Sequence, residues 1–271
     1  MTIPAAGRTG GTVAPGAFPA GVFTPDPRRP SAWRMVGAAS GLELKLLLRN
    51  GEQLLLALII PLAVLVGLTM VSVVELASPR IDTVTPGVLA LAILSTAFTS
   101  QAITTAFDRR YGVLKRLAAA GVGRSLLVAG KCGAALTVIV GQWLILGGVA
   151  LMLGWHPRGN PVWLALLALL GAAAFIGLAL LVGGTLRAEA VLALANLIWL
   201  AMVLVGGVVV PLTSAPGWLR MVGGFTPAGA LSTGLRDVLG AGVAPTGGTL
   251  AVLAVWVVVG WAGTVRWFRW Q

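Results

Sequence analysis

The segment FDRRYGVLKRLAAAGVGR, residues 107–124, concentrates charge in a chain that has little of it, since only 10% of its 271 residues are charged. Its charged residues are Asp108, Arg109, Arg110, Lys115, Arg116 and Arg124. The apolar side chains of Tyr111, Leu114 and Leu117 recur three residues apart, which places them on one face of a helix. Long apolar stretches flank this short basic helix on both sides.

Residues with catalytic chemistry are scarce. The nearest match to a phosphate-binding loop runs to Gly130-Lys131-Cys132, but Ser125 stands where the first glycine is required and Cys132 replaces the serine or threonine. His156 is the single histidine and Cys132 the single cysteine, so a hydrolytic dyad, a histidine-based metal site and an intrachain disulfide all lack partners. We expect no catalytic residue, no metal and no cofactor on this chain, and any ATPase that drives it to be another chain.

Large neutral polar side chains interrupt the apolar stretches at Gln101, Gln142 and Asn196. They either form hydrogen bonds between helices or, together with Thr104 and Trp199, line a path for a substrate. Mostly apolar walls with a few polar groups suit a neutral or zwitterionic amphiphile. No carboxylate falls in the middle of any apolar stretch, which counts against a proton- or sodium-driven carrier.

The composition indicates what must position these residues. The chain is 58% hydrophobic, with a mean hydropathy of +0.95. It contains six apolar stretches of the length, about 20 residues, that crosses a bilayer. We therefore predict an all-α polytopic membrane protein with six transmembrane helices, at about 53–74, 85–107, 126–153, 163–186, 191–210 and 249–265.

The net charge of +11 is distributed unevenly over these predicted spans. Fifteen of the 19 basic residues fall on one side, and Arg80, Arg158, Arg220 and Arg236 fall on the other. Basic residues gather in cytoplasmic loops, so both termini should be cytoplasmic. The charge then follows from topology and membrane lipids, and does not indicate nucleic acid.

Three segments are not predicted to span. Residues 1–30, rich in proline, should be a flexible cytoplasmic tail that precedes the transmembrane domain at 31–271. Residues 31–50 mix apolar and charged side chains and predict an amphipathic interfacial helix, the alternative being an extension of the first span. Residues 211–248 are broken by proline and glycine and predict short re-entrant helices between spans five and six, covered by protein.

Three stretches carry a resemblance to a known family. They are LLLRNGEQLLLALIIPLAVLVG (46–67), FDRRYGVLKRLAAAGVGR (107–124) and GGVVVPLTSAPGWLRMVGGFTPAGALSTGLRDVL (206–239). Together they resemble type-2 ATP-binding-cassette (ABC) exporter permeases of the daunorubicin-resistance-like branch, which exports drugs and lipids. The chain departs from the family pattern at Gly112-Val113 and Ala120-Gly121, where many members have Gly-Thr and Thr-Pro.

The resemblance implies that the basic segment is the coupling helix, which docks on a separate ATPase subunit present in two copies. The implied coupling residues are Asp108, Arg109, Arg110, Tyr111, Gly112, Leu114, Lys115, Arg116 and Leu117. Enforcement of topology alone explains the sign of the charges but not the apolar stripe. ATP and Mg would bind the ATPase, and this chain would not itself be an enzyme.

The resemblance also implies a second permease, either a copy of this chain or a related one, in a bacterial plasma membrane. The substrate would be an amphiphilic drug, polyketide or lipid moved out of the cytoplasm or the inner leaflet. Two other classes stay open on the residues alone: a secondary carrier or channel, and a polytopic membrane enzyme or assembly factor.

Overall fold

The structure is a computed structural model that describes residues 31–49, 51–71 and 78–269. The described residues form helices and no strands. The long helices are α1 (Ala32–Arg49), α2 (Gly51–Met70), α3 (Arg80–Ile93), α4 (Gln101–Arg110), α6 (Arg124–Met152), α7 (Pro161–Thr185), α8 (Ala188–Val205) and α11 (Gly247–Trp267). The short ones are α5 (Val113–Ala119), α9 (Gly217–Gly224), α10 (Pro227–Arg236), a 3-10 turn at Leu212–Ser214 and π-helical turns at Leu94–Ser100 and Asp237–Ala241. The tail predicted at 1–30 lies outside the described residues.

Five helices in the described part of the chain are long and apolar enough to cross a membrane. They are Arg80–Arg110, Arg124–Met152, Pro161–Thr185, Ala188–Val205 and Gly247–Trp267. Of the span predicted at 53–74, the described apolar part is the shorter helix Ala57–Met70. The chain is therefore an all-α polytopic membrane protein.

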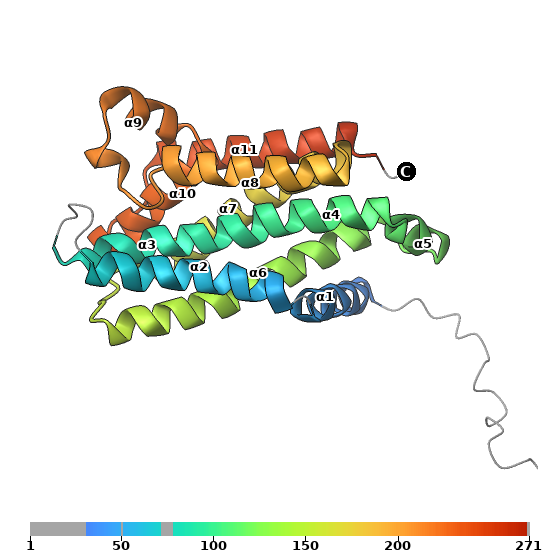
Figure 1. Cartoon of the computed structure of the whole chain (residues 1–271), viewed down its shortest axis with the longest axis horizontal. Coiled ribbons are helices and arrows are strands. Elements are labelled where there is room, and N and C mark those ends of the chain that lie inside the picture. Colours follow the sequence, from blue (N-terminus) through green and yellow to red (C-terminus); the bar gives the residue numbers. More distant parts are fainter. Residues whose placement is uncertain (1–30, 50, 72–77, 270–271) are drawn as a thin grey trace, which may run out of the picture.

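The helix from Arg80 to Arg110, which joins α3, the π-helical turn and α4, is the centre of the bundle. Of its most apolar window 83% is buried, against 22–28% for α6, α8 and α11. It packs against α2, α6, α7 and α8. The long helices run side by side, with α1 and α5 at one end and α9 and α10 at the other (Figure 1).

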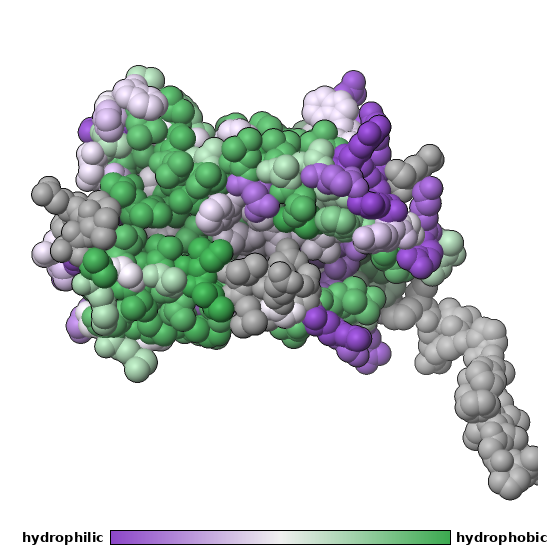
Figure 2. Space-filling model, viewed as in Figure 1, coloured by the Kyte–Doolittle hydropathy of each residue, from purple (hydrophilic) through white to green (hydrophobic). Residues whose placement is uncertain are grey.

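Charge and apolar surface are separated along this bundle. Hydrophilic side chains gather at the end that carries α5, and hydrophobic ones cover much of the rest of the face shown in Figure 2. The sequence explains this end: α4 finishes with Arg109 and Arg110, α11 with Arg266, and α1 with Arg49. We call it the basic end. Helix α1 buries none of its side chains completely and packs on α6, where Gly130 and Gly133 leave room for it.

Helices α7 and α11 pack against each other more extensively than any other pair of described helices. A Cβ atom on Gly260 would lie 2.9 Å from the Leu178 backbone nitrogen, so only glycine allows this approach. The Thr264 hydroxyl donates to the Gly177 carbonyl at 2.9 Å, and the Trp261 indole to the Ala173 carbonyl at 3.0 Å. Small residues at a helix crossing thus permit both packing and polar contacts in an apolar setting.

Short helices cap the opposite end of the bundle. Helix α10 is mostly buried against α3, α7 and α11, so its backbone is covered by protein, as short helices within a membrane require. Arg236, at the end of α10, donates to the carbonyls of Gly207 at 2.7 Å and Val208 at 2.8 Å. These hydrogen bonds satisfy two backbone carbonyls in the non-helical segment that follows α8.

The crossing of α7 and α11 gives a direct stability test. Gly260→Ala should lower the stability of the purified chain by about 1–3 kcal/mol, because the added methyl group overpacks the contact. Gly148→Ala is the matched control, since Gly148 lies on α6 with nothing within 4 Å of an added Cβ. It should be neutral or slightly stabilising. Equal thermal unfolding of the two variants in detergent would contradict this account of the contact.

Candidate functional site

Helix α5 is a short helix held at the basic end by a glycine turn. The chain leaves α4 at Tyr111 and turns through Gly112, whose φ of +69° favours glycine over any other residue. Tyr111 is 64% exposed, and Lys115 and Arg116 are exposed as well. Val113 and Leu117 are half-buried. The outer face of α5 is therefore basic, and the exposed Tyr111 lies just before it.

Leu114 corrects one part of the expected docking face. Its side chain is only 3% exposed, so it packs against the chain itself and is not available to enter a groove on a partner. Its helical spacing from Leu117 predicts that both lie on the same side of the helix. The spacing identified the apolar side of the helix. Of these side chains, that of Leu114 is buried and packs α5 against the bundle, and that of Leu117 is half-buried.

Lys131 binds two carboxylates beside the start of α5. Its ammonium nitrogen lies 2.7 Å from an Asp108 oxygen on α4 and 3.3 Å from a Glu43 oxygen on α1, and its side chain is only 1% exposed. Lys131 therefore does not reach out to the headgroups, because both carboxylates neutralise it inside the protein. Removing one partner of a buried ion pair is costly. This triad of Glu43, Asp108 and Lys131 therefore fixes α1, α4 and α6 relative to one another.

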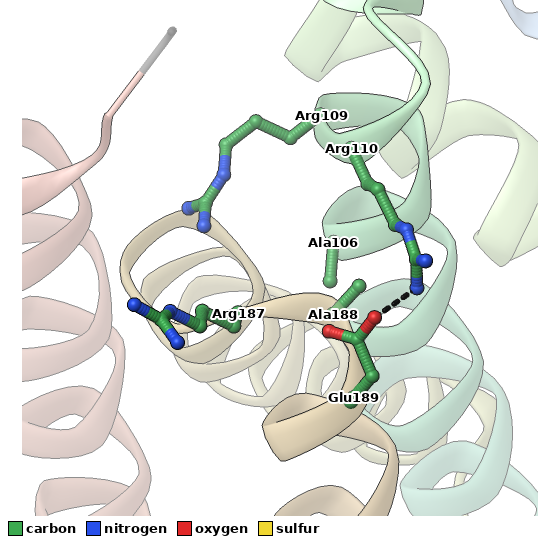
Figure 3. Close-up of a pocket in the computed structure, with 6 residues that line it drawn as sticks. All are labelled: Ala106, Arg109, Arg110, Arg187, Ala188 and Glu189. Carbon is green, nitrogen blue, oxygen red and sulfur yellow. Dashed lines mark hydrogen bonds and ion pairs between the residues drawn. The ribbon is translucent and has the colours of Figure 1, made fainter.

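Two arginines tie the end of α4 to the turn between α7 and α8. Arg109 donates to the carbonyls of Gly183, at 3.3 Å, and Leu186. Arg110 pairs with Glu189 in the first turn of α8, on an exposed surface (Figure 3). Surface pairs contribute at most about 1 kcal/mol each. The Arg109 contacts contribute more than the Arg110–Glu189 pair. The Arg109 guanidinium donates to carbonyls at the end of α7 that have no partner within the helix.

Taken together, these contacts connect the end of α4, which leads into α5, with the helices around it. The two residues before Tyr111 bind the α7–α8 turn, and Asp108 binds α6 and α1 through Lys131. The end of α4, from which the chain enters α5, is thus linked to several helices by charge-assisted contacts. The residues expected at 108–112 lie together at this junction, while Lys115, Arg116 and Leu117 lie beyond it on α5. Of these three, Arg116 reaches back, since its guanidinium donates to the Tyr111 carbonyl at 3.0 Å.

The polar side chains expected to line a substrate path fall into two groups. Gln142 is buried, accepting from the Thr96 hydroxyl at 2.9 Å and donating to the Ala57 carbonyl at 2.9 Å, so it links α6, the central helix and α2. Gln101 is also buried, and its side-chain oxygen has no hydrogen-bond partner among the described residues. Their burial does not fit a role as path-lining groups in the single chain, and the interhelical alternative describes Gln142 well.

The other group lies at or near the surface. Thr104 and Trp199 are half-buried, and the Trp199 indole donates to the Ser95 hydroxyl at 3.0 Å. Asn196, near the middle of α8, is exposed and donates to the Leu192 carbonyl of its own helix. Ser95 belongs to the π-helical turn, a distortion that often marks functional segments in membrane and soluble helices. Thr104, Asn196 and Trp199 therefore keep access to the surface of the chain.

Sequence reasoning missed the partners that position α5, namely Glu43, Lys131 and Glu189. A signal was present, because the chain has only 8 acidic residues against 19 basic ones. In such a chain each acidic residue near a predicted basic helix is a candidate ion-pair partner. Which base it binds depends on helix packing, which the spacing along the sequence does not give.

Comparison with protein families identifies the class to which this architecture belongs. Residues 18–239 match the family of ABC-2 type transporters, which covers the central helix, α5 and the short helices after α8. The chain belongs to this family, and it is the membrane-embedded permease component of an ABC-type transporter. Permeases of this family typically pair with a separate ATPase subunit. No curated protein matched the chain.

The triad of Glu43, Asp108 and Lys131 predicts an order of stabilities. Lys131→Met should cost about 3 kcal/mol or more, because it leaves two carboxylates without their shared cation. Asp108→Asn should cost less, and Glu43→Gln least, since the Glu43 contact is longer. Lys115→Met, on the exposed face of α5, is the control and should be nearly neutral. Thermal unfolding in detergent measures the series, and a Lys131 variant as stable as the Lys115 variant would contradict the assignment.

Proposed function

We propose that this chain is the permease of an ATP-driven exporter in a bacterial plasma membrane, working with a second permease and two ATPase subunits. The observation that carries the proposal is α5, a short helix with exposed basic residues at the basic end, which follows the exposed Tyr111. The end of α4, which leads into α5, binds the α7–α8 turn and, through Lys131, α6 and α1, and such a link suits a coupling helix. ATP and Mg would bind the ATPase, and this chain would supply the path and the mechanical link.

The substrate that fits the surface is a neutral or zwitterionic amphiphile, such as a drug, a polyketide or a lipid. Asn196 supports this, because an exposed amide halfway along a membrane helix is costly against lipid and calls for a polar or protein neighbour. A second permease facing α8 would provide one. Thr104 and Trp199 then join Asn196 as path residues, whereas Gln101 and Gln142 serve the packing of the bundle.

The first prediction from this proposal concerns orientation. The basic end should face the cytoplasm, because the excess of basic residues lies there. In a Cys132→Ser background, a single cysteine at Ser214 should react with an impermeant thiol reagent on intact cells, and one at Ala119 should react only after lysis. Both positions are exposed in the chain. Labelling of the Ala119 position from outside would refute the orientation.

The second concerns docking of the ATPase. The double variant Lys115→Glu with Arg116→Glu should lower capture of the ATPase at least tenfold, because it reverses the charge of the outer face of α5. Arg34→Glu with Lys45→Glu is the matched control: it reverses two exposed charges on α1, at the same end. Capture is measured by pull-down in mild detergent, with thermal unfolding to show that all variants are folded. Equal capture by both double variants would count against α5 as the coupling helix.

A further inference from the structure

An open pocket of about 280 Å³ lies at the basic end, beside the junction of α4, α7 and α8. It is lined by Ala106, Arg109, Arg110, Arg187, Ala188 and Glu189 (Figure 3). The two alanines are buried and small, which leaves the space. The three arginines come from the end of α4 and from the residue before α8, so the pocket is built by two separate parts of the chain.

The pocket carries more positive charge than its own contacts neutralise. Three guanidiniums against the single carboxylate of Glu189 leave a net charge of +2, and Glu189 is already paired with Arg110. Arg109 uses two of its five N–H groups on backbone carbonyls, which leaves the others for a ligand. The Arg187 guanidinium has no hydrogen bond or ion pair to any described residue, and Figure 3 shows it on the same side of the pocket as that of Arg109.

A further cation stands next to this group. The backbone N–H of Arg269 donates to the Gly184 carbonyl at 3.0 Å, and its charge repels that of Arg109. Cations held this close favour a bound anion that bridges them. Guanidinium groups match phosphate oxygens in geometry and bind them through paired hydrogen bonds.

The position of the pocket favours a phosphate that belongs to a lipid headgroup over a free phosphate ion. The candidate spans end at Arg110 and Thr185 and begin again at Ala188, so the pocket lies where apolar helices meet the charged end. Leu186 is 37% exposed and Leu192 is 45% exposed close by in the chain, which provides apolar surface for acyl chains. Basic pockets between membrane helices on the cytoplasmic side are suited to anionic headgroups.

We propose that this pocket binds the phosphate of an anionic phospholipid from the leaflet at the basic end. Arg109 and Arg187 hold the phosphate oxygens, and the acyl chains lie against the apolar surface of α8. A bound lipid would offset the repulsion among the arginines and brace the α4 to α8 junction. The inference concerns a resident lipid, distinct from the exported substrate, and does not depend on docking of the ATPase.

The test uses the full-length chain in neutral detergent, titrated with phosphatidylglycerol and followed by native mass spectrometry. Arg187→Gln should weaken binding of phosphatidylglycerol about fivefold, the factor expected for one basic residue near an anionic lipid. Arg34→Gln, which removes an exposed arginine from α1 at the same end, is the matched control and should change binding less than twofold. Glu189→Gln should tighten binding, because it raises the charge of the pocket, and a misfolded variant would not do so.

Three outcomes would overturn the proposal. In the first, Arg187→Gln and Arg34→Gln weaken binding equally, or Glu189→Gln fails to tighten it. In the second, phosphatidylcholine binds as well as phosphatidylglycerol, or inorganic phosphate displaces the lipid at similar concentrations, which would assign the pocket to a free anion. In the third, Arg187→Gln abolishes capture of the ATPase and leaves lipid binding unchanged, which would make the pocket a protein contact.

Discussion

The structure depends on the neutralisation of a buried cation at the basic end of an apolar helix bundle. An ammonium group as buried as that of Lys131 is stable only if anions neutralise it, and Asp108 and Glu43 do so from two other helices. These two ion pairs hold α1 and the end of α4 against α6 at the basic end. The turn at Gly112 and helix α5 follow directly after that end of α4, so the ion triad and the glycine turn together position α5.

The cost of an unsatisfied polar group in an apolar setting also separates the polar residues of the membrane region into two groups. Those that join helices are satisfied by the chain: Gln142 binds Thr96 and a backbone carbonyl, and the Trp261 indole binds a carbonyl of α7. Asn196, by contrast, is exposed halfway along α8. An exposed amide in that position is costly against lipid, which supports the proposed second permease. Burial thus separates the polar residues that build the bundle from those open to a neighbour.

Much of the helical architecture followed from the sequence because apolar length and charge are strong signals in a membrane protein. The short basic helix after Arg110 was predicted from its composition, and the covered helix α10 from its proline and glycine content. Leu114 shows the limit, since helical spacing defines a stripe but not the direction that the stripe faces. Lys131 shows a second limit, because its partners Glu43 and Asp108 are 88 and 23 residues away and meet it only through packing.

The central claim is that the outer face of α5 contacts an ATPase. Site-specific photocrosslinking in native membranes tests this contact directly, with a photoreactive amino acid in place of Lys115 and, as a reference at the same end, in place of Arg34. The account predicts an ATPase-sized adduct from position 115 that is much stronger than any adduct from position 34. An ATPase adduct from position 34 alone, or none from position 115 in cells that contain the assembled transporter, would contradict it.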